Sequence, residues 1–542
     1  MDIISVVLVM LLAVVAGSWL DRVSPVALPP PLVQIVLGAG IGLTTDLRVN
    51  LNPDVFFLLF LPPMLFLDGW RIPKDGLLRD KGAILALAFG LVVFTVVGVG
   101  HLIHWMIPAT SIPVAFALAA VLAPTDPIAV SAIAQRVPMP NRFLRILEGE
   151  SLLNDASGLV SLRFAVAAAL TGAFSPLDAT ATLLWLVSCG VLTGFVTTWT
   201  VAKAKNWVAL RYGEETGAQI LISLLMPFAA YIAAEHLGGS GILAAVTAGI
   251  TMSYVEMTGQ ALAVTRIRRE AVWDMVRLAL DGIIFVLLGE QLPAILKGAA
   301  QTVRESGHHD PKWLAIYVVA IVVALGSTRF AWVWTSAQFT LFRRANRGLA
   351  SKKPTLWLVA AVSASGVRGT VTLAGALSLP DGTAFPTRDL AIFLAAGVIV
   401  VSQVLASIVL PALLKRMELP PEPSYQQEED QIRIGAAEAA IRAIEEARNK
   451  LARARPNADC YATAASYATD PYRRRIDGLS QIGEAAVIAS EISEIEQELR
   501  LEGLRAERYE ILRLTNGKLA RQALARRLVR ELDLAEARYV IP

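Results

Sequence analysis

Thirteen separate stretches of this chain are apolar enough to enter a lipid bilayer as helices. A helix needs about 20 apolar residues to cross the hydrocarbon core, and only the second and ninth stretches are clearly short. The predicted spans are 2–20, 27–45, 53–70, 82–106, 112–134, 142–172, 181–203, 216–236, 239–254, 271–296, 313–342, 354–379 and 389–415. A backbone in lipid must satisfy its own hydrogen bonds, so the pattern predicts an all-α polytopic membrane protein.

Charge density divides the chain into two parts. About 13% of residues 1–420 are charged, against about 33% of residues 421–542. We therefore predict a transmembrane domain over 1–418 and a helical cytoplasmic domain over 419–542. Helices are expected in the second domain at 429–455, 484–513 and 516–539. That domain carries no catalytic motif, so a regulatory or oligomerisation role is expected.

The overall composition excludes several classes of protein. A net charge of +3 in 542 residues is too balanced to indicate a nucleic-acid partner. Because the chain has two cysteines, it is not a disulfide scaffold. The phosphate-binding loop motif of a primary pump is absent from the sequence, which disfavours that class. We expect no enzymatic activity and no cofactor.

The basic residues between the spans predict an orientation, because cytoplasmic loops collect Lys and Arg. With thirteen spans, one side receives five cations and the other nineteen. The richer side is the one reached after the odd-numbered spans. The N-terminus is therefore expected outside and the C-terminus in the cytoplasm, in a cell (inner) membrane.

Span 5 is interrupted by a polar segment. Residues 123–127 read Ala-Pro-Thr-Asp-Pro, which places Thr125 and Asp126 between two prolines. Each proline removes a backbone donor and frees a carbonyl group one turn earlier, so the helix is expected to unwind there. The alternative is a simple proline kink with a buried, paired Asp126.

Span 6 carries a dense polar group. Glu150 and Asn154 share one helical face, and Ser151 and Asp155 share a neighbouring one. Carboxylate, hydroxyl and amide oxygens are the ligands that hard cations prefer. The span therefore predicts a cation site within the membrane, although these residues could also lie solvated at the cytoplasmic mouth. Arg163, further along this span, receives no role.

Span 12 is the second interrupted span. Residues 363–372 combine glycines, hydroxyl groups and Arg368 within an apolar run. Two broken helices in corresponding halves are typical of a transporter site built from inverted repeats. The odd offset of seven spans predicts that the two repeats run in opposite directions through the bilayer. We expect their two unwound helices to cross. Asp126 can then neutralise exposed helix N-termini, and Arg368 exposed C-termini.

Charged residues elsewhere in the spans need partners. Arg329 in span 11 requires an acid if it is buried, and we expect Glu150 to be that acid. Asp281, Glu290 and Glu235 are expected near interfaces or pore walls and are left without a role.

The polar segments resemble those of the monovalent cation:proton antiporter family, which includes animal sodium/hydrogen exchangers and bacterial NhaP-type antiporters. The match covers about residues 1–415 and consists of several motifs in the same order. They are residues 55–63 (VFFLLFLPP), 125–127 (TDP), 150–155 (ESLLND), 284–289 (IFVLLG) and 366–369 (GVRG).

The resemblance implies a thirteen-helix fold with a dimerisation domain, a mobile six-helix core and a homodimeric assembly. It implies that Asp155 carries the transported cation or proton. Ser151, Glu150 and the backbone near Thr125 would supply further ligands or support, so that Asp155, Ser151 and Thr125 hold the metal ion. Arg329 resembles the arginine that pairs with the glutamate of this family. Asparagine at position 154 resembles the electroneutral members.

These features predict a secondary antiporter that exchanges a monovalent cation, Na⁺ first, for H⁺ across the membrane in a 1:1, electroneutral cycle. A buried carboxylate holds a proton more firmly than one in water, and it cannot hold a metal ion at the same time. Asp155 would bind the two alternately while the protein alternates its access. A K⁺/H⁺ antiporter of the same fold is the alternative. Rivals of other classes are an ion channel and an intramembrane aspartyl protease, but the latter's Gly-x-Gly-Asp signature is absent.

Overall fold

The computed structural model of the protein divides into two compact units, Met1–Leu419 and Pro420–Pro542. Every regular element among the described residues is a helix. The described residues are 3–23, 29–45, 53–72, 79–108, 110–126, 130–131, 139, 141–171, 176–257, 262–305, 312–345, 356–379, 385, 387–416, 423–454, 458–480, 484–515, 527–529 and 531–536.

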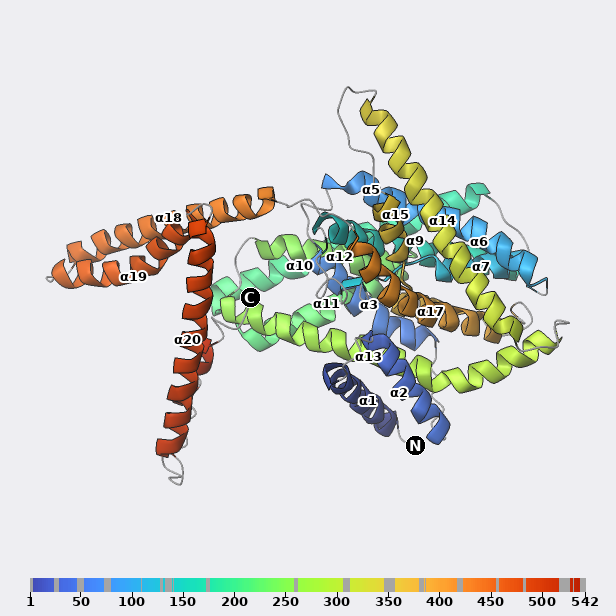
Figure 1. Ribbon diagram of the computed structural model, residues 1–542, viewed down its shortest axis with the longest axis horizontal. Helices are drawn as coiled ribbons and strands as arrows, with labels where there is room; N and C mark the ends of the chain where they lie inside the picture. The colour runs from blue at the N-terminus through green and yellow to red at the C-terminus, as the bar shows by residue number, and fades with distance from the viewer. Residues whose placement is uncertain are drawn as a thin grey trace. The chain divides into compact units, whose positions relative to one another are not determined.

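The first unit is built from helices (Figure 1). Its helices are α1 (Ile3–Val23), α2 (Pro30–Thr44), α3 (Pro53–Arg71), α5 (Lys81–Leu85), the π-helical η1 (Ala86–Leu91), α6 (Val92–Met106), α7 (Ile112–Leu122), α9 (Asn141–Thr171), α10 (Pro176–Tyr212), α11 (Thr216–His236), α12 (Gly241–Met257), α13 (Ala263–Glu305), α14 (Lys312–Ala345), α15 (Leu356–Ala364), α16 (Thr370–Leu377) and α17 (Arg388–Leu414).

A helix occupies each of the thirteen predicted spans, with some differences in length. Seven helical stretches among the described residues are both long and apolar enough to cross a bilayer, and α2, α7 and α12 are apolar but shorter. The tenth span is longer than predicted, since α13 extends over 43 residues. The number of helices that cross the membrane therefore remains a prediction.

Both interrupted spans are broken where the sequence places polar residues. Helix α7 ends at Leu122 and is followed by non-helical backbone at residues 124–126. In span 12, α15 ends at Ala364 and α16 begins at Thr370, with non-helical residues 366–369 between them. Pro127, the second proline of the first break, lies outside the described residues.

Glycines allow close approach of α2 and α13. A Cβ atom at Gly38 would overlap the carbonyl oxygen of Val286, and one at Gly289 would overlap that of Ile35. The two backbones are therefore in direct contact. Inside a bilayer the hydrophobic effect does not drive helices together, so they associate through van der Waals packing of small residues. This explains why glycines lie at this crossing.

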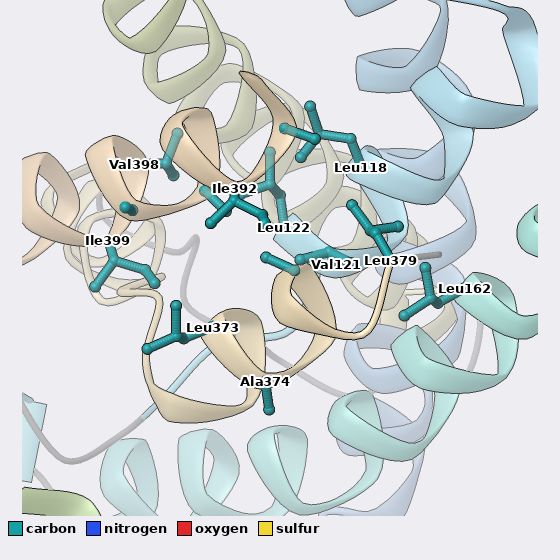
Figure 2. Close-up of a cluster of buried hydrophobic side chains, with 14 of the residues drawn as sticks. Leu118, Val121, Leu122, Leu162, Leu373, Ala374, Leu379, Ile392, Val398 and Ile399 are labelled. Atoms are coloured by element: carbon teal, nitrogen blue, oxygen red, sulfur yellow. The ribbon is translucent and has the colours of Figure 1, made fainter. Parts of the chain in front are cut away.

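The core of the first unit surrounds the two broken helices. Side chains of α7, α9, α16 and α17 meet in a tightly packed cluster (Figure 2). It includes Leu118, Val121, Leu122, Leu162, Leu373, Ala374, Leu379, Ile392, Val398 and Ile399. These apolar contacts hold α7 and α16 in place although neither helix is long enough to cross the membrane alone.

The fourth span contains a π-helical segment that the sequence analysis did not predict. A π-turn leaves carbonyl groups poorly satisfied by their own helix. Here Ser157 of α9 donates a hydrogen bond to the carbonyl oxygen of Ala88 at 2.5 Å. Trp332 of α14 donates one to that of Ala86 at 3.1 Å. Neighbouring helices thus compensate the irregular backbone.

The second unit consists of α18 (Pro423–Ala454), α19 (Ala458–Leu479) and α20 (Glu484–Thr515), with helical turns at residues 527–529 and 531–536. Helices α18 and α19 lie side by side (Figure 1). The first and third correspond to predicted helices, whereas α19 was missed because it contains Pro471 and few large apolar residues. The predicted helix at 516–539 contains the two helical turns at 527–529 and 531–536, and its other residues lie outside the described part of the chain.

Candidate functional site

The polar residues of span 6 are buried on α9. Glu150, Ser151, Asn154 and Asp155 each expose 6% or less of their surface. Their side chains are therefore buried inside the helices of the first unit. Helical spacing places Ser151 and Asp155 one turn apart, so both can face one cavity.

Glu150 is neutralised by an arginine from a distant helix. Arg329 of α14 contacts both carboxylate oxygens, and its Nη2 atom donates to Oε2 at 2.7 Å. Its Nε atom donates to the carbonyl oxygen of Val362 in α15 at 2.9 Å. A bidentate pair of this kind is the strongest arrangement available to two buried charges. The structure therefore contains the Glu150–Arg329 ion pair expected from the sequence.

Thr125 links the broken helix α7 to α9. Its hydroxyl group donates to Oε1 of Glu150 at 3.3 Å and accepts a hydrogen bond from Nδ2 of Asn154 at 2.8 Å. The amide oxygen of Asn154 is buried and has no hydrogen-bond partner in the described part of the chain. Asn154 thus both positions Thr125 and keeps one oxygen available as a ligand.

Asp155 differs from Glu150, because no arginine of the described part of the chain pairs with its carboxylate. Among the described residues, no ion pair and no hydrogen bond of its carboxylate is found. The side chain lines a cavity together with Thr125, Asp126 and Ser151. This cavity therefore collects the carboxylate and hydroxyl oxygens that the sequence analysis selected as candidate ligands.

The two broken helices meet beside this cavity. The backbone N–H group of Asp126 donates to the carbonyl oxygen of Val367 at 2.7 Å, which joins the two non-helical segments directly. The carboxylate of Asp126 packs against Gly369, the residue before α16, where any Cβ atom would overlap it. Asp126 thus lies at the N-terminal end of α16, where a negative charge is favourable.

Arg368 lies on the opposite side of the crossing. Its Nε atom donates to the carbonyl oxygen of Leu122, the last residue of α7, at 2.9 Å. Its Nη1 atom donates to the carbonyl oxygen of Gly366, just beyond α15. Carbonyl groups at helix C-termini lack partners within the helix. Arg368 satisfies one carbonyl group at each break, and its role in charge compensation stays a prediction.

The far wall of the cavity is formed by α3 and α13, and sequence analysis missed most of its polar residues. Asp68, Arg277 and Asp281 line the same cavity as Asp155. From the sequence, Asp281 is expected near an interface or a pore wall but receives no role, and Asp68 and Arg277 are not singled out. A signal was present, because Arg277 and Asp281 are charged residues one helical turn apart within a predicted span.

Three further charged residues, Arg163, Glu235 and Glu290, do not line the cavity. Arg163 donates to the carboxylate of Glu235 in α11 at 2.9 Å, and Glu235 also accepts a hydrogen bond from the backbone of Gly241. This pair joins α9 to the α11–α12 connection and gives Arg163 a structural partner. Glu290 is buried on α13, whose backbone packs against Gly42 of α2.

Comparison with known proteins places this arrangement in a family. The chain is 39% identical over 552 residues to an uncharacterized Na⁺/H⁺ exchanger, YjcE, of Escherichia coli (strain K12), covering 99% of both chains. It is 40% identical over 426 residues to a sodium, potassium, lithium and rubidium/H⁺ antiporter of Bacillus pumilus (strain SAFR-032). That match covers 77% of this chain and 62% of the relative.

The fold is shared with a solved antiporter. The sodium proton antiporter MjNhaP1 of Methanocaldococcus jannaschii superposes with a TM-score of 0.56 at 18% identity, covering 77% of this chain and 99% of that one. The family model "Sodium/hydrogen exchanger, transmembrane" matches residues 7–416. This range contains all the cavity residues described above. The chain therefore belongs to the sodium/hydrogen exchanger family of multi-pass membrane transporters, and its activity is cation/proton antiport.

Proposed function

We propose that this antiporter exchanges one Na⁺ for one H⁺ and that the carboxylate of Asp155 carries both in turn. The observation that carries the proposal is the contrast between two acids five residues apart. Glu150 is held by Arg329, whereas Asp155 lines the cavity with no ion-pair partner among the described residues. A buried acid without a cationic partner favours a proton or a bound metal ion.

Oxygen atoms around Asp155 support cation binding. Ser151 and Thr125 contribute hydroxyl groups to the cavity wall, and Asp126 contributes a second carboxylate. The unpartnered amide oxygen of Asn154 is one helical turn from Ser151. A dehydrated alkali cation accepts ligands of this type. In this proposal Glu150 and Asn154 support the site, and Arg329 and Arg368 compensate charges around it.

Exchange follows from competition at Asp155. The carboxylate holds either the metal ion or the proton, and its charge is neutralised in both cases. If only the neutralised site crosses between the two sides, each inward step of one species requires an outward step of the other. Asn154 stands where a second acid would add another titrating group beside Asp155, which supports a 1:1 stoichiometry without net charge movement.

Potassium is the alternative substrate. The Bacillus pumilus relative is named for sodium, potassium, lithium and rubidium, and carboxylate and hydroxyl oxygens bind any of these ions. Sodium is favoured because the family and the Escherichia coli relative are named for Na⁺/H⁺ exchange. A channel would be recognised by current at constant pH, which an electroneutral exchanger does not carry.

We further infer the cellular arrangement from the charge asymmetry of the loops. The N-terminus lies outside and the C-terminal unit in the cytoplasm of a cell membrane, where it regulates or assembles the protein. The first unit comprises a dimerisation part and an ion-binding core, and the protein works as a homodimer surrounded by lipid. No nucleic acid and no resident cofactor takes part.

The test is transport by purified protein in proteoliposomes, followed with an internal pH dye. Addition of NaCl at clamped membrane potential is expected to change internal pH in the wild type, and KCl and LiCl are compared with it. Asp155→Asn removes the titrating group and is expected to abolish the signal. Asp274→Asn is the matched control, because Asp274 pairs with Arg71 at an exposed position and does not line the cavity. Normal Na⁺-dependent proton flux in the Asp155→Asn protein would refute the proposal.

A further inference from the structure

An arginine lies on the cavity wall that faces Asp155. Nη1 of Arg277 lies 3.2 Å from Oδ1 of Asp68 on α3, and its Nε lies 3.5 Å from Oδ2 of Asp281 on the next turn of α13. All three side chains line the cavity that also contains Asp155. A guanidinium group is thus held between two carboxylates inside the space proposed for the transported ion.

The charges in this cavity are strongly unequal. Among the described residues that line it, four are acids (Asp68, Asp126, Asp155 and Asp281) and one, Arg277, is a base. Such a concave surface concentrates cations from solution. Arg277 carries the same charge as the transported cation but is covalently attached, so it reduces this attraction permanently.

The geometry allows Arg277 to act without blocking the site. Its ion pairs are with Asp68 and Asp281, and none is formed with Asp155. The side chain of Arg277 exposes 30% of its surface, and that of Asp68 exposes 37%. The arginine therefore pairs with Asp68 and Asp281, the outer carboxylates of the cavity, and leaves Asp155 to the ion.

We propose that Arg277 is a tethered counter-cation that competes with the transported ion for the outer carboxylates of the cavity and thereby sets the apparent affinity of the antiporter. This inference rests on the proposed function, since it concerns the same cavity. Arg277 does not touch the ion at Asp155; it determines how much cation gathers in front of it.

The sign of the effect follows from charge. Removing the guanidinium charge leaves Asp68 and Asp281 uncompensated, so the cavity attracts more cation and the KM for Na⁺ falls. Removing the charge of Asp68 has the opposite effect. Two charges several ångströms apart in a partly hydrated cavity interact enough to change KM about threefold to tenfold. Because solvent ions screen this interaction, the change is expected to shrink as ionic strength rises.

The experiment measures the KM for Na⁺ in proteoliposomes with the full-length protein. Arg277→Gln is expected to lower KM about threefold to tenfold, and Arg277→Lys, which keeps the charge, to stay close to the wild type. Asp68→Asn is expected to raise KM by a similar factor, and the double variant to return towards the wild type. Arg163→Gln is the control, since Arg163 forms an ion pair between helices but does not line the cavity.

The outcomes separate this inference from the proposed function. A wild type without Na⁺-dependent proton flux would refute the proposed function. With an active wild type, an unchanged or raised KM in Arg277→Gln overturns the role of Arg277. So does a KM shift that is independent of ionic strength. If Arg277→Gln cannot be purified folded, an unchanged or lowered KM in Asp68→Asn overturns it instead.

Discussion

The two units of the protein use the same pair of residue types in different ways. In the membrane unit, Glu150 and Arg329 are 179 positions apart and each exposes 2% or less of its side chain. In the C-terminal unit, Glu429 and Arg433 lie one helical turn apart, and Nη2 of Arg433 is 2.6 Å from Oε1 of Glu429. About half of each side chain is exposed. The first pair joins two helices that are distant in the sequence, and the second lies on the surface of a single helix.

The difference shows where charge contributes to structure. Removing one partner of a buried pair leaves an uncompensated charge in a low-dielectric environment. Removing one partner of an exposed pair leaves a hydrated charge, and such pairs contribute little. Buried pairs such as Glu150–Arg329 should therefore tolerate little change, whereas exposed pairs such as Glu429–Arg433 should be replaceable.

The largest expected effect comes from breaking the buried pair. Glu150→Gln leaves Arg329 without its acid and should lower the free energy of unfolding by about 3–5 kcal/mol. Thermal unfolding of the purified protein in detergent measures this loss. The double variant Glu150→Gln/Arg329→Gln removes both charges and should recover part of it. An unfolding temperature equal to that of the wild type in Glu150→Gln would contradict the contrast between the units.

A smaller effect is expected at the crossing of the broken helices. Gly369→Ala introduces a Cβ atom that overlaps the carboxylate of Asp126, so one of the two segments must move. Overpacking of this kind typically costs about 1–3 kcal/mol, and the same thermal measurement detects it. Gly326→Ala in α14 is the control, because nothing lies within 4 Å of the added atom. Equal stability of both variants would show that the crossing is not tightly packed.

The smallest effect is expected in the C-terminal unit. Arg433→Ala removes an exposed pair on α18 and should change the free energy of unfolding by about 0.3–0.5 kcal/mol. Chemical denaturation of the full-length protein, followed by far-UV circular dichroism, provides the measurement. The charge-reversed pair Glu429→Arg/Arg433→Glu serves as its control. A loss as large as that of Glu150→Gln would mean that this surface is covered by another part of the assembly.

Much of the membrane unit could be predicted because its signals are local. Apolar length identifies the spans, and prolines or glycines identify the two breaks, since each acts on its own stretch of backbone. The tail was harder to interpret. Helix α19 was missed, because it contains Pro471 and few large apolar residues.

The sequence predicted the site residues on span 6 and at the two breaks, but not the opposite wall of the cavity. The sequence placed Glu150 and Asp155 on one helix but offered the Glu150–Arg329 pair only as an expectation. Asp68 and Arg277 were overlooked because neither lies in a polar motif, and only the packing of α3 against the rest of the bundle brings them to the cavity.

The amino-acid order alone determined that this chain enters a membrane, where its helices break and which oxygen-bearing side chains are available. Only the tertiary structure decided which acid receives a cationic partner and which remains open to an ion. The physical reason is that periodicity and backbone breaks depend on neighbouring residues. The charge state of a buried acid depends on groups that folding brings from helices far away in the chain.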